Sequence, residues 1–235
     1  MMVLIYFLIF ILGSSSGSFA VCCGWRFANS YSLISYCSFC EACHIPLKKR
    51  YLVPLIGFLM QGGRCVFCHA KISAISFIVE LLFGCYYLFL FALNSNKTVF
   101  PFLAALALWS LILAFQDFYS LTISNGLLWL GGFFLLLVNY SEFLRHLLDW
   151  KFILFFLIAL AFFSYFQYLG LGDLIYIGFL FLLLGFYTTL YIILLGSSCA
   201  AFYQFFSLKK KIAFIPFLSL GLLIVLLWSK NIVIY

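Results

Sequence analysis

The feature that most constrains this chain is its succession of long apolar runs without charged residues. The first run, residues 2–23, contains no charged side chain, and similar runs recur to the end of the 235 residues. A helix needs about 20 apolar residues to cross the hydrocarbon core of a bilayer, whereas a membrane barrel shows short alternating segments. Because only 8% of the residues are charged, a large soluble domain is excluded. The pattern predicts an all-α polytopic membrane protein.

About eight transmembrane helices account for these runs. We expect them at roughly 2–23, 73–94, 98–116, 123–140, 151–169, 173–186, 188–207 and 213–229. The chain then divides into a first span (1–23), one polar segment (24–72) and a multi-span membrane domain (73–235). A cleaved signal peptide is the alternative for the first span. It would lack a positively charged start and would export the basic segment that follows.

The distribution of basic residues predicts the orientation in the membrane. Alternating spans with an outside N-terminus leave nine basic residues inside: Arg26, Lys48, Lys49, Arg50, Arg64, Lys71, Lys209, Lys210 and Lys211. Only four lie outside: Lys97, Arg145, Lys151 and Lys230. Cytoplasmic loops are enriched in Lys and Arg, so the polar segment is predicted to be cytoplasmic. The net charge of +7 is therefore explained by the basic cytoplasmic loops of a protein embedded in membrane lipid. We expect no nucleic-acid partner.

Four cysteines in the polar segment form two Cys-x-x-Cys pairs. Cys40 and Cys43 are followed, after 21 intervening residues, by Cys65 and Cys68. Cytoplasmic thiols stay reduced, and two such pairs supply the four thiolates of a structural zinc site. Cys37 and Cys40 would make an equally good first pair, so the choice between Cys37 and Cys43 stays open at this point. Unligated thiols are the plainer alternative.

Two aspartates lie at predicted span boundaries on the cytoplasmic side. Asp117 follows the apolar run 106–115, and Asp173 ends the stretch Gly170-Leu171-Gly172-Asp173. Ionisable groups at membrane depth are candidates for function. Two carboxyls held close together cannot both ionise easily, so the pair can share a proton, as in aspartic proteases. Gly170 and Gly172 allow close backbone approach. Each aspartate alone could instead be a helix cap or a loop residue.

These residues, in this order, resemble the type IV prepilin leader peptidases, which are two-aspartate membrane proteases with a G-x-G-D motif. The motifs are Gly17-Ser18-Phe19 with Arg26, Pro54, the four cysteines with Gly63-Arg64-Cys65, Val79-Glu80-Leu81-Leu82, Asp117 with Ile123-Ser124-Asn125, Gly170 to Asp173, and Ile215-Pro216-Phe217-Leu218. The short, very apolar chain is most similar to the competence-type enzymes of Gram-positive bacteria. Ser124 stands where the family has proline, and Ile175 where many members have lysine.

The resemblance implies an activity. It predicts a multi-pass protein of the bacterial cytoplasmic membrane that removes the short basic leader of a prepilin or pseudopilin precursor at the cytoplasmic face. Asp117 and Asp173 would be catalytic, with Gly170, Gly172 and Glu80 in support, and the family comparison favours Cys43 over Cys37 as a zinc ligand. Many members also methylate the new N-terminus with S-adenosylmethionine. The sequence contains no glycine-rich nucleotide loop, so methylation is implied by resemblance only.

Two other functions fit the residues without the motif order. One is a zinc-binding membrane scaffold whose aspartates are interfacial. The other is a small transporter in which Asp117, Asp173 and Glu80 form a proton relay. Glu80 discriminates the transporter from the protease. A proton relay requires Glu80 within reach of both aspartates, whereas a protease requires it only as a structural carboxyl.

Overall fold

The computed structural model describes residues 2–32, 38–94, 97–147, 150–166, 169–207 and 211–228. The described residues are largely helical, and their two isolated β-bridges both lie beside the cysteines. The chain forms two compact units, Met1–Ala92 and Leu93–Tyr235. The division into segments 1–23, 24–72 and 73–235 concerns membrane topology and stays a prediction.

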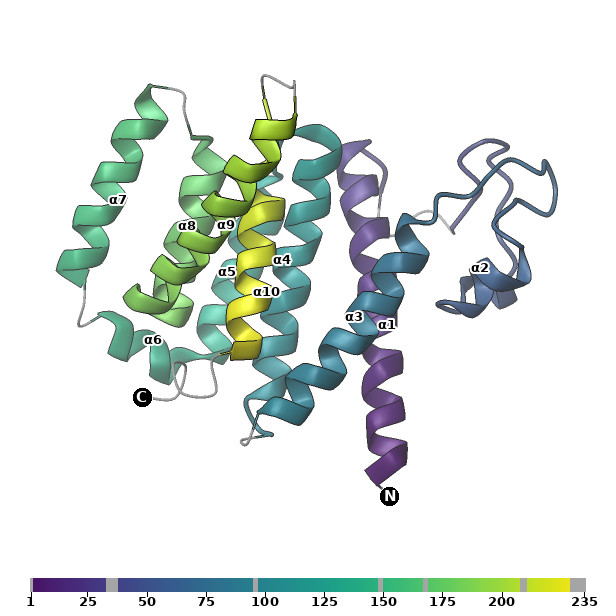
Figure 1. The fold of residues 1–235 in the computed structure, drawn as a ribbon, viewed down its shortest axis with the longest axis horizontal. Helices are drawn as coiled ribbons and strands as arrows, with labels where there is room; N and C mark the ends of the chain where they lie inside the picture. Colours follow the sequence, from purple (N-terminus) through teal and green to yellow (C-terminus); the bar gives the residue numbers. More distant parts are fainter. Residues whose placement is uncertain are drawn as a thin grey trace. The chain divides into compact units, whose positions relative to one another are not determined.

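The N-terminal unit contains two long apolar helices, α1 and α3, and the polar segment that connects them in the sequence (Figure 1). Its elements are α1 (Met2–Ala28), the 3-10 helix η1 (Lys49–Leu52), α2 (Ile56–Met60) and α3 (Ile75–Leu93). Small residues bring α1 and α3 together, as is common for helices in membranes. A Cβ on Gly13 would lie 2.5 Å from the backbone oxygen of Phe83, and one on Gly84 would lie 2.5 Å from Ser14 Oγ. A side chain on Gly13 would push the α3 backbone away, and one on Gly84 would displace the side chains of Ser14 and Phe10.

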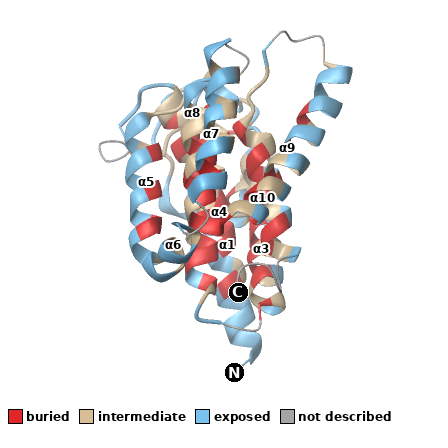
Figure 2. Cartoon of the chain, turned by 90° about the vertical axis from the view of Figure 1, so that its left-hand side faces the viewer, coloured by how far each residue is buried: buried red, intermediate tan, exposed pale blue. Residues whose placement is uncertain are grey.

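The C-terminal unit is a bundle built around α4 and α10. Its elements are α4 (Phe100–Ser120), α5 (Asn125–Val138), α6 (Tyr140–His146), α7 (Trp150–Tyr165), α8 (Leu171–Leu184), α9 (Phe186–Phe206) and α10 (Ile215–Trp228). α4 packs against α5 and α10, and α10 also packs against α9. In the most apolar stretch of α4, 67% of the residues are buried, against 22% in α9. Figure 2 shows buried residues gathered on α4, α8 and α10.

The backbone explains where the helices nearest the two aspartates begin and end. α4 stops at Leu121, which adopts a φ of 54° and whose N–H donates to the Asp117 carbonyl oxygen. α8 stops at Gly185, where φ is 81°. A side chain there would collide with the His146 ring, 2.7 Å from the position of a Cβ. A left-handed residue thus ends α4 just after Asp117, and a glycine with positive φ ends α8.

Each of the eight predicted apolar runs forms a helix, but the count of eight spans is not confirmed. Among the described residues, four helices are long and apolar enough to cross a membrane: α1, α3, α4 and α9. Helices of 14 residues, such as α8 and α10, measure about 21 Å, which is short of a hydrocarbon core of about 30 Å. Apolarity alone predicts a nonaqueous setting and does not fix the unbroken length of a helix.

α6 is an element that the apolar runs did not predict. It follows α5 after a bend of 97° and mixes polar and apolar residues, with Glu142 paired to Arg145 at 3.2 Å. Counting α5 and α6 as one broken span raises the number of candidate spans to five. Its composition is that of a short helix at a polar boundary, which a search for long apolar runs overlooks.

Candidate active site and metal centre

Asp117 lies in the last turn of α4, and its carboxyl group is turned into the protein. Its side chain is 6% exposed. Its Oδ2 accepts a hydrogen bond of 3.1 Å from the backbone N–H of Ile215, the first residue of α10. The first N–H groups of a helix have no partner within the helix. Asp117 therefore caps α10, and α10 in turn fixes the orientation of the carboxyl group.

Asp173 is the third residue of α8 and is half-buried. Its Oδ2 accepts a hydrogen bond of 3.2 Å from the Gly170 N–H, the residue that precedes the helix. This is the carboxylate half of a capping box. The capping role considered as an alternative for each aspartate is therefore present for both. A capping bond orients a carboxyl group and is compatible with chemistry at that group.

The aspartates lie on facing sides of α4 and α8. Asp117 is two turns from Ser110 on one face of α4, and Asp173 is one turn from Tyr176 on one face of α8. The Ser110 and Tyr176 hydroxyls are hydrogen-bonded to each other in the buried interior. This hydrogen bond places the faces of α4 and α8 that carry the two aspartates against each other.

The two glycines predicted to support the site have distinct roles. Gly170 supplies the N–H that binds Asp173. A Cβ on Gly172 would lie 2.6 Å from Cδ1 of Ile123, in the connection between α4 and α5. The absence of a side chain at Gly172 therefore lets α8 begin against the segment that follows Asp117.

Glu80 lies in the N-terminal unit and is engaged there. It is 6% exposed on α3. Its Oε2 accepts a 2.7 Å hydrogen bond from the Leu55 N–H, and its Oε1 accepts a 3.0 Å hydrogen bond from the Ser76 hydroxyl. Leu55 has a φ of 63°, a conformation that is strained for a branched residue. Glu80 thus holds the polar segment to a membrane helix, and this favours the structural role over the proton relay.

The four predicted cysteines form one cluster. Their Sγ atoms lie within 4.8 Å of one another. The Cys40–Cys68 sulfurs are 3.8 Å apart, and the Cys43–Cys65 sulfurs are 3.9 Å apart. A tetrahedral zinc site with Zn–S bonds of about 2.3 Å places its sulfurs about 3.8 Å apart. The cluster therefore has the dimensions of a metal site with four cysteine ligands. Cys37, the alternative ligand, lies outside the described residues.

The two halves of the cluster repeat one backbone motif. In each half, the backbone carbonyl oxygen of the first cysteine accepts a hydrogen bond from the N–H of the residue four positions later. The donors are His44, at 2.8 Å from Cys40 O, and His69, at 2.9 Å from Cys65 O. Both histidines have a φ of 56°. A β-bridge closes each half: Phe39 with Pro46, and Arg64 with Lys71. Two equivalent turns that present paired thiols to a common point are the usual construction of a structural zinc site.

The electrostatics of the cluster suit a metal ion. The N–H groups of Cys68 and Phe67 lower the pKa of the Cys65 thiol to about 6. For Cys43 the N–H of Ile45 lowers the pKa, but burial and the neighbouring thiols outweigh it and raise the pKa to about 11. Thiols crowded together resist collective ionisation, whereas a bound cation stabilises all of them as thiolates.

The sequence indicated Ile215 only as part of a motif and did not predict its contact with Asp117, and it did not single out Gln116. The Ile215 backbone binds Asp117 across 98 residues of chain, and no local pattern encodes such a pairing. Gln116 is 3% exposed, and its Oε1 atom has no hydrogen-bond partner among the described residues. A polar amide in an otherwise apolar run directly before Asp117 was the available signal for Gln116.

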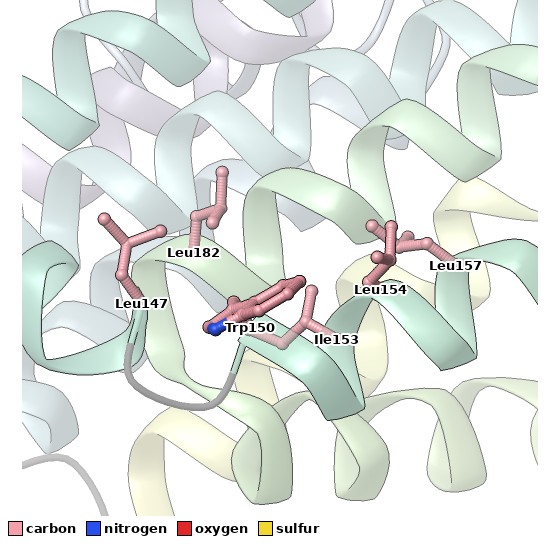
Figure 3. A pocket seen from close by; sticks show the side chains of 6 residues that line it. All are labelled: Leu147, Trp150, Ile153, Leu154, Leu157 and Leu182. Atoms are coloured by element: carbon pink, nitrogen blue, oxygen red, sulfur yellow. The ribbon is translucent and has the colours of Figure 1, made fainter.

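A separate cavity lies at the junction of α7 and α8. Figure 3 shows the side chains that line it: Leu147, Trp150, Ile153, Leu154, Leu157 and Leu182. Its volume is about 200 Å³. The lining is five aliphatic side chains and one indole, so the cavity offers no set of polar groups for a nucleoside.

Comparison with known proteins agrees with the motifs. Residues 11–93 match the family described as the Bacterial Peptidase A24 N-terminal domain. The chain is 31% identical over 126 residues to the "Prepilin leader peptidase/N-methyltransferase" of Bacillus subtilis (strain 168), covering 52% of this chain and 49% of that protein. It is 30% identical over 57 residues to the protein of the same name from Neisseria gonorrhoeae, covering 24% and 20%. No solved structure matches.

These matches confirm the resemblance to the prepilin leader peptidase family. The chain spans about half the length of the Bacillus subtilis relative and a fifth of the Neisseria gonorrhoeae relative. The matched family domain contains the four cysteines and Glu80, and it ends before Asp117 and Asp173.

Proposed function

We propose, on the premise of this resemblance, that the chain is an aspartic endopeptidase of the bacterial cytoplasmic membrane. Its substrate would be a type IV prepilin or pseudopilin precursor, cut at the cytoplasmic face so that the short basic leader is released. The observation that carries the proposal is the pair of carboxyls on the sides of α4 and α8 that face each other across the buried Ser110–Tyr176 hydrogen bond.

In this mechanism one aspartate is ionised and the other is protonated. The ionised carboxylate takes a proton from a water molecule, and the oxygen of that water attacks the scissile carbonyl carbon. The protonated carboxyl donates a hydrogen bond to the carbonyl oxygen and stabilises the tetrahedral intermediate. A proton then passes to the leaving amine, and the peptide bond breaks. A coupled pair of carboxyls titrates as a unit, so the shared proton belongs to the pair and not to one aspartate.

The backbone hydrogen bonds at each aspartate serve this chemistry by restricting motion. Asp117 is held by the N–H of Ile215, and Asp173 by the N–H of Gly170. Catalytic groups held in one orientation avoid the loss of entropy that would otherwise accompany the reaction. Gly172 leaves room for the Ile123 side chain, so that α8 can begin against the segment that follows Asp117.

The metal that the cysteine cluster fits best is zinc, held by Cys40, Cys43, Cys65 and Cys68. Four thiolates leave no open coordination position, so the zinc would be structural and would stabilise the folded polar segment. For N-methylation, which the names of the two relatives include, the apolar cavity beside α7 does not fit S-adenosylmethionine.

The direct test is co-expression with a tagged pseudopilin precursor, followed by gel mobility and intact mass. We expect a product shortened by its basic leader, and no shortening without the enzyme. An unshortened precursor, with both proteins present in the membrane, would favour the scaffold or the transporter. The new N-terminal mass also reports methylation, because each methyl group adds a fixed increment to the product.

A further inference from the structure

The polar segment exposes several large apolar side chains that lie close together in the sequence, on α2 and just before it. Leu52 is 42% exposed, Val53 45%, Ile56 53%, Leu59 66% and Met60 56%. We call these five residues the α2 patch. Single exposed apolar residues are ordinary, but a contiguous group on a segment predicted to lie in water marks an interaction surface.

The α2 patch is distinct from the packing face of the same helix. Phe58 stacks on Phe77 of α3 with ring centroids 5.0 Å apart. A Cβ on Gly57 would collide with the backbone oxygen of Tyr51. These contacts fix α2 against η1 and α3 through one side. Ile56, Leu59 and Met60 occupy the other side, so their exposure follows from the fold of the unit.

The same polar segment is rich in exposed basic residues. Five exposed cations lie in the segment: Lys48, Lys49, Arg50, Arg64 and Lys71. Between residues 38 and 74 the sequence has a single acidic residue, Glu41. Arg50 lies over the Tyr51 ring at 4.8 Å, which holds its guanidinium close to the patch. The surface therefore combines apolar side chains with a strong positive charge.

The chain keeps this surface next to a bilayer. The segment is connected at one end to α1 and at the other to α3, and both are candidate membrane spans. Exposed apolar side chains with neighbouring Lys and Arg are the composition of elements that lie in the membrane interface. Anionic headgroups attract such cations, and their long side chains reach the phosphates while the apolar residues enter the acyl boundary.

We propose that the α2 patch docks on the anionic lipid leaflet beside it. Leu59 and Met60, the most exposed members, enter the interface, and Lys48, Lys49 and Arg50 contact lipid phosphates. A basic leader peptide is a poor occupant for the same surface, because like charges repel. The inference rests on the spans that flank the segment and on its charge, and it does not depend on the proposed protease activity.

The experiment compares backbone hydrogen exchange of the full chain in two kinds of nanodisc. One contains phosphatidylcholine alone, and the other contains equal amounts of phosphatidylglycerol and phosphatidylcholine. We expect amides of residues 52–63 to exchange about tenfold more slowly in the anionic nanodiscs. Molar salt should abolish this difference in the wild-type chain, because it screens attraction to the headgroups.

Two variants locate the effect. Leu59→Gln with Met60→Gln keeps side-chain length and charge but removes apolar contact, so exchange should become the same in both lipids. Val66→Gln is the matched control, because Val66 is 46% exposed in the second cysteine turn and lies outside the α2 patch. It should retain the tenfold difference. Unchanged reactivity of the clustered thiols shows that each variant is folded.

Three results would overturn the proposal. The first is equal exchange of the wild-type chain in both lipids. The second is equally slow exchange in both lipids and in detergent, since another protein surface would then cover the α2 patch. The third is the same loss in Val66→Gln as in the double variant, because the docking surface would then lie elsewhere.

Discussion

Removing the Glu80 carboxyl should release the polar segment from α3 without unfolding the bundle. In Glu80→Ala the Leu55 N–H loses the acceptor that holds it at 2.7 Å. A hydrogen bond to a carboxylate contributes about 1.5–3 kcal/mol, and the Ser76 hydroxyl can turn to a backbone carbonyl instead. Local opening around Leu55 should therefore become about 10- to 150-fold more frequent.

The measurement is hydrogen exchange at Leu55 and Gly57, whose N–H groups are bound by Glu80 and by the Val53 carbonyl. Glu80→Gln is the matched control, because its amide oxygen can still accept from Leu55 and only a few-fold change should follow. Relaxation of the Leu55 backbone, at a φ of 63°, would add to the opening in Glu80→Ala. Unchanged exchange in Glu80→Ala would refute the anchoring role and reopen the proton relay.

Three further predictions concern the metal centre and the helix contacts. Purified protein should carry one zinc per chain by mass spectrometry of metals, and Cys43→Ser should lose it while Cys85→Ser keeps it; retention in Cys43→Ser would contradict the ligand set. Ser110→Ala and Tyr176→Phe should each lower the free energy of unfolding by about 1–3 kcal/mol. The double variant should lower it by less than the sum of the two, since no buried hydroxyl is then left unpaired. Additive losses would argue against a hydrogen bond between the two hydroxyls. Gly84→Leu should destabilise the N-terminal unit by about 1–3 kcal/mol through overpacking, and an unchanged melting temperature would show that α1 and α3 are not in close contact.

Local sequence patterns predicted the helices and the clustering of the four cysteines well. The apolar runs predicted a helix at each of eight positions. They did so because a helix that is buried in protein and a helix that contacts lipid have the same apolar composition. Two Cys-x-x-Cys pairs predicted one cluster, because each pair needs only a tight turn to direct both thiols to a point. The number of unbroken spans could not be read in this way. Gly185 and the bend after α5 interrupt apolar sequence without changing its composition.

The candidate active site was predictable as a pair of residues and not as a geometry. Asp117 and Asp173 were recognisable because charge is rare in this chain. Their facing arrangement depends on the contact of Ser110 with Tyr176, and their orientation depends on Ile215 and Gly170. These contacts arise from packing between distant helices. The role of Glu80 was likewise fixed only by its contact with the Leu55 backbone.

The central claim is that Asp117 and Asp173 act together to activate water. Asp117→Asn and Asp173→Asn preserve volume and hydrogen-bond acceptors for Ile215 and Gly170, but remove the ability to carry a proton. Co-expressed with a pseudopilin precursor, each variant should accumulate in the membrane and bind zinc as the wild type does. Each should abolish leader removal, and the double variant should be no worse, because residues that act as a unit are not additive. Normal processing of the precursor by either single variant would contradict the account.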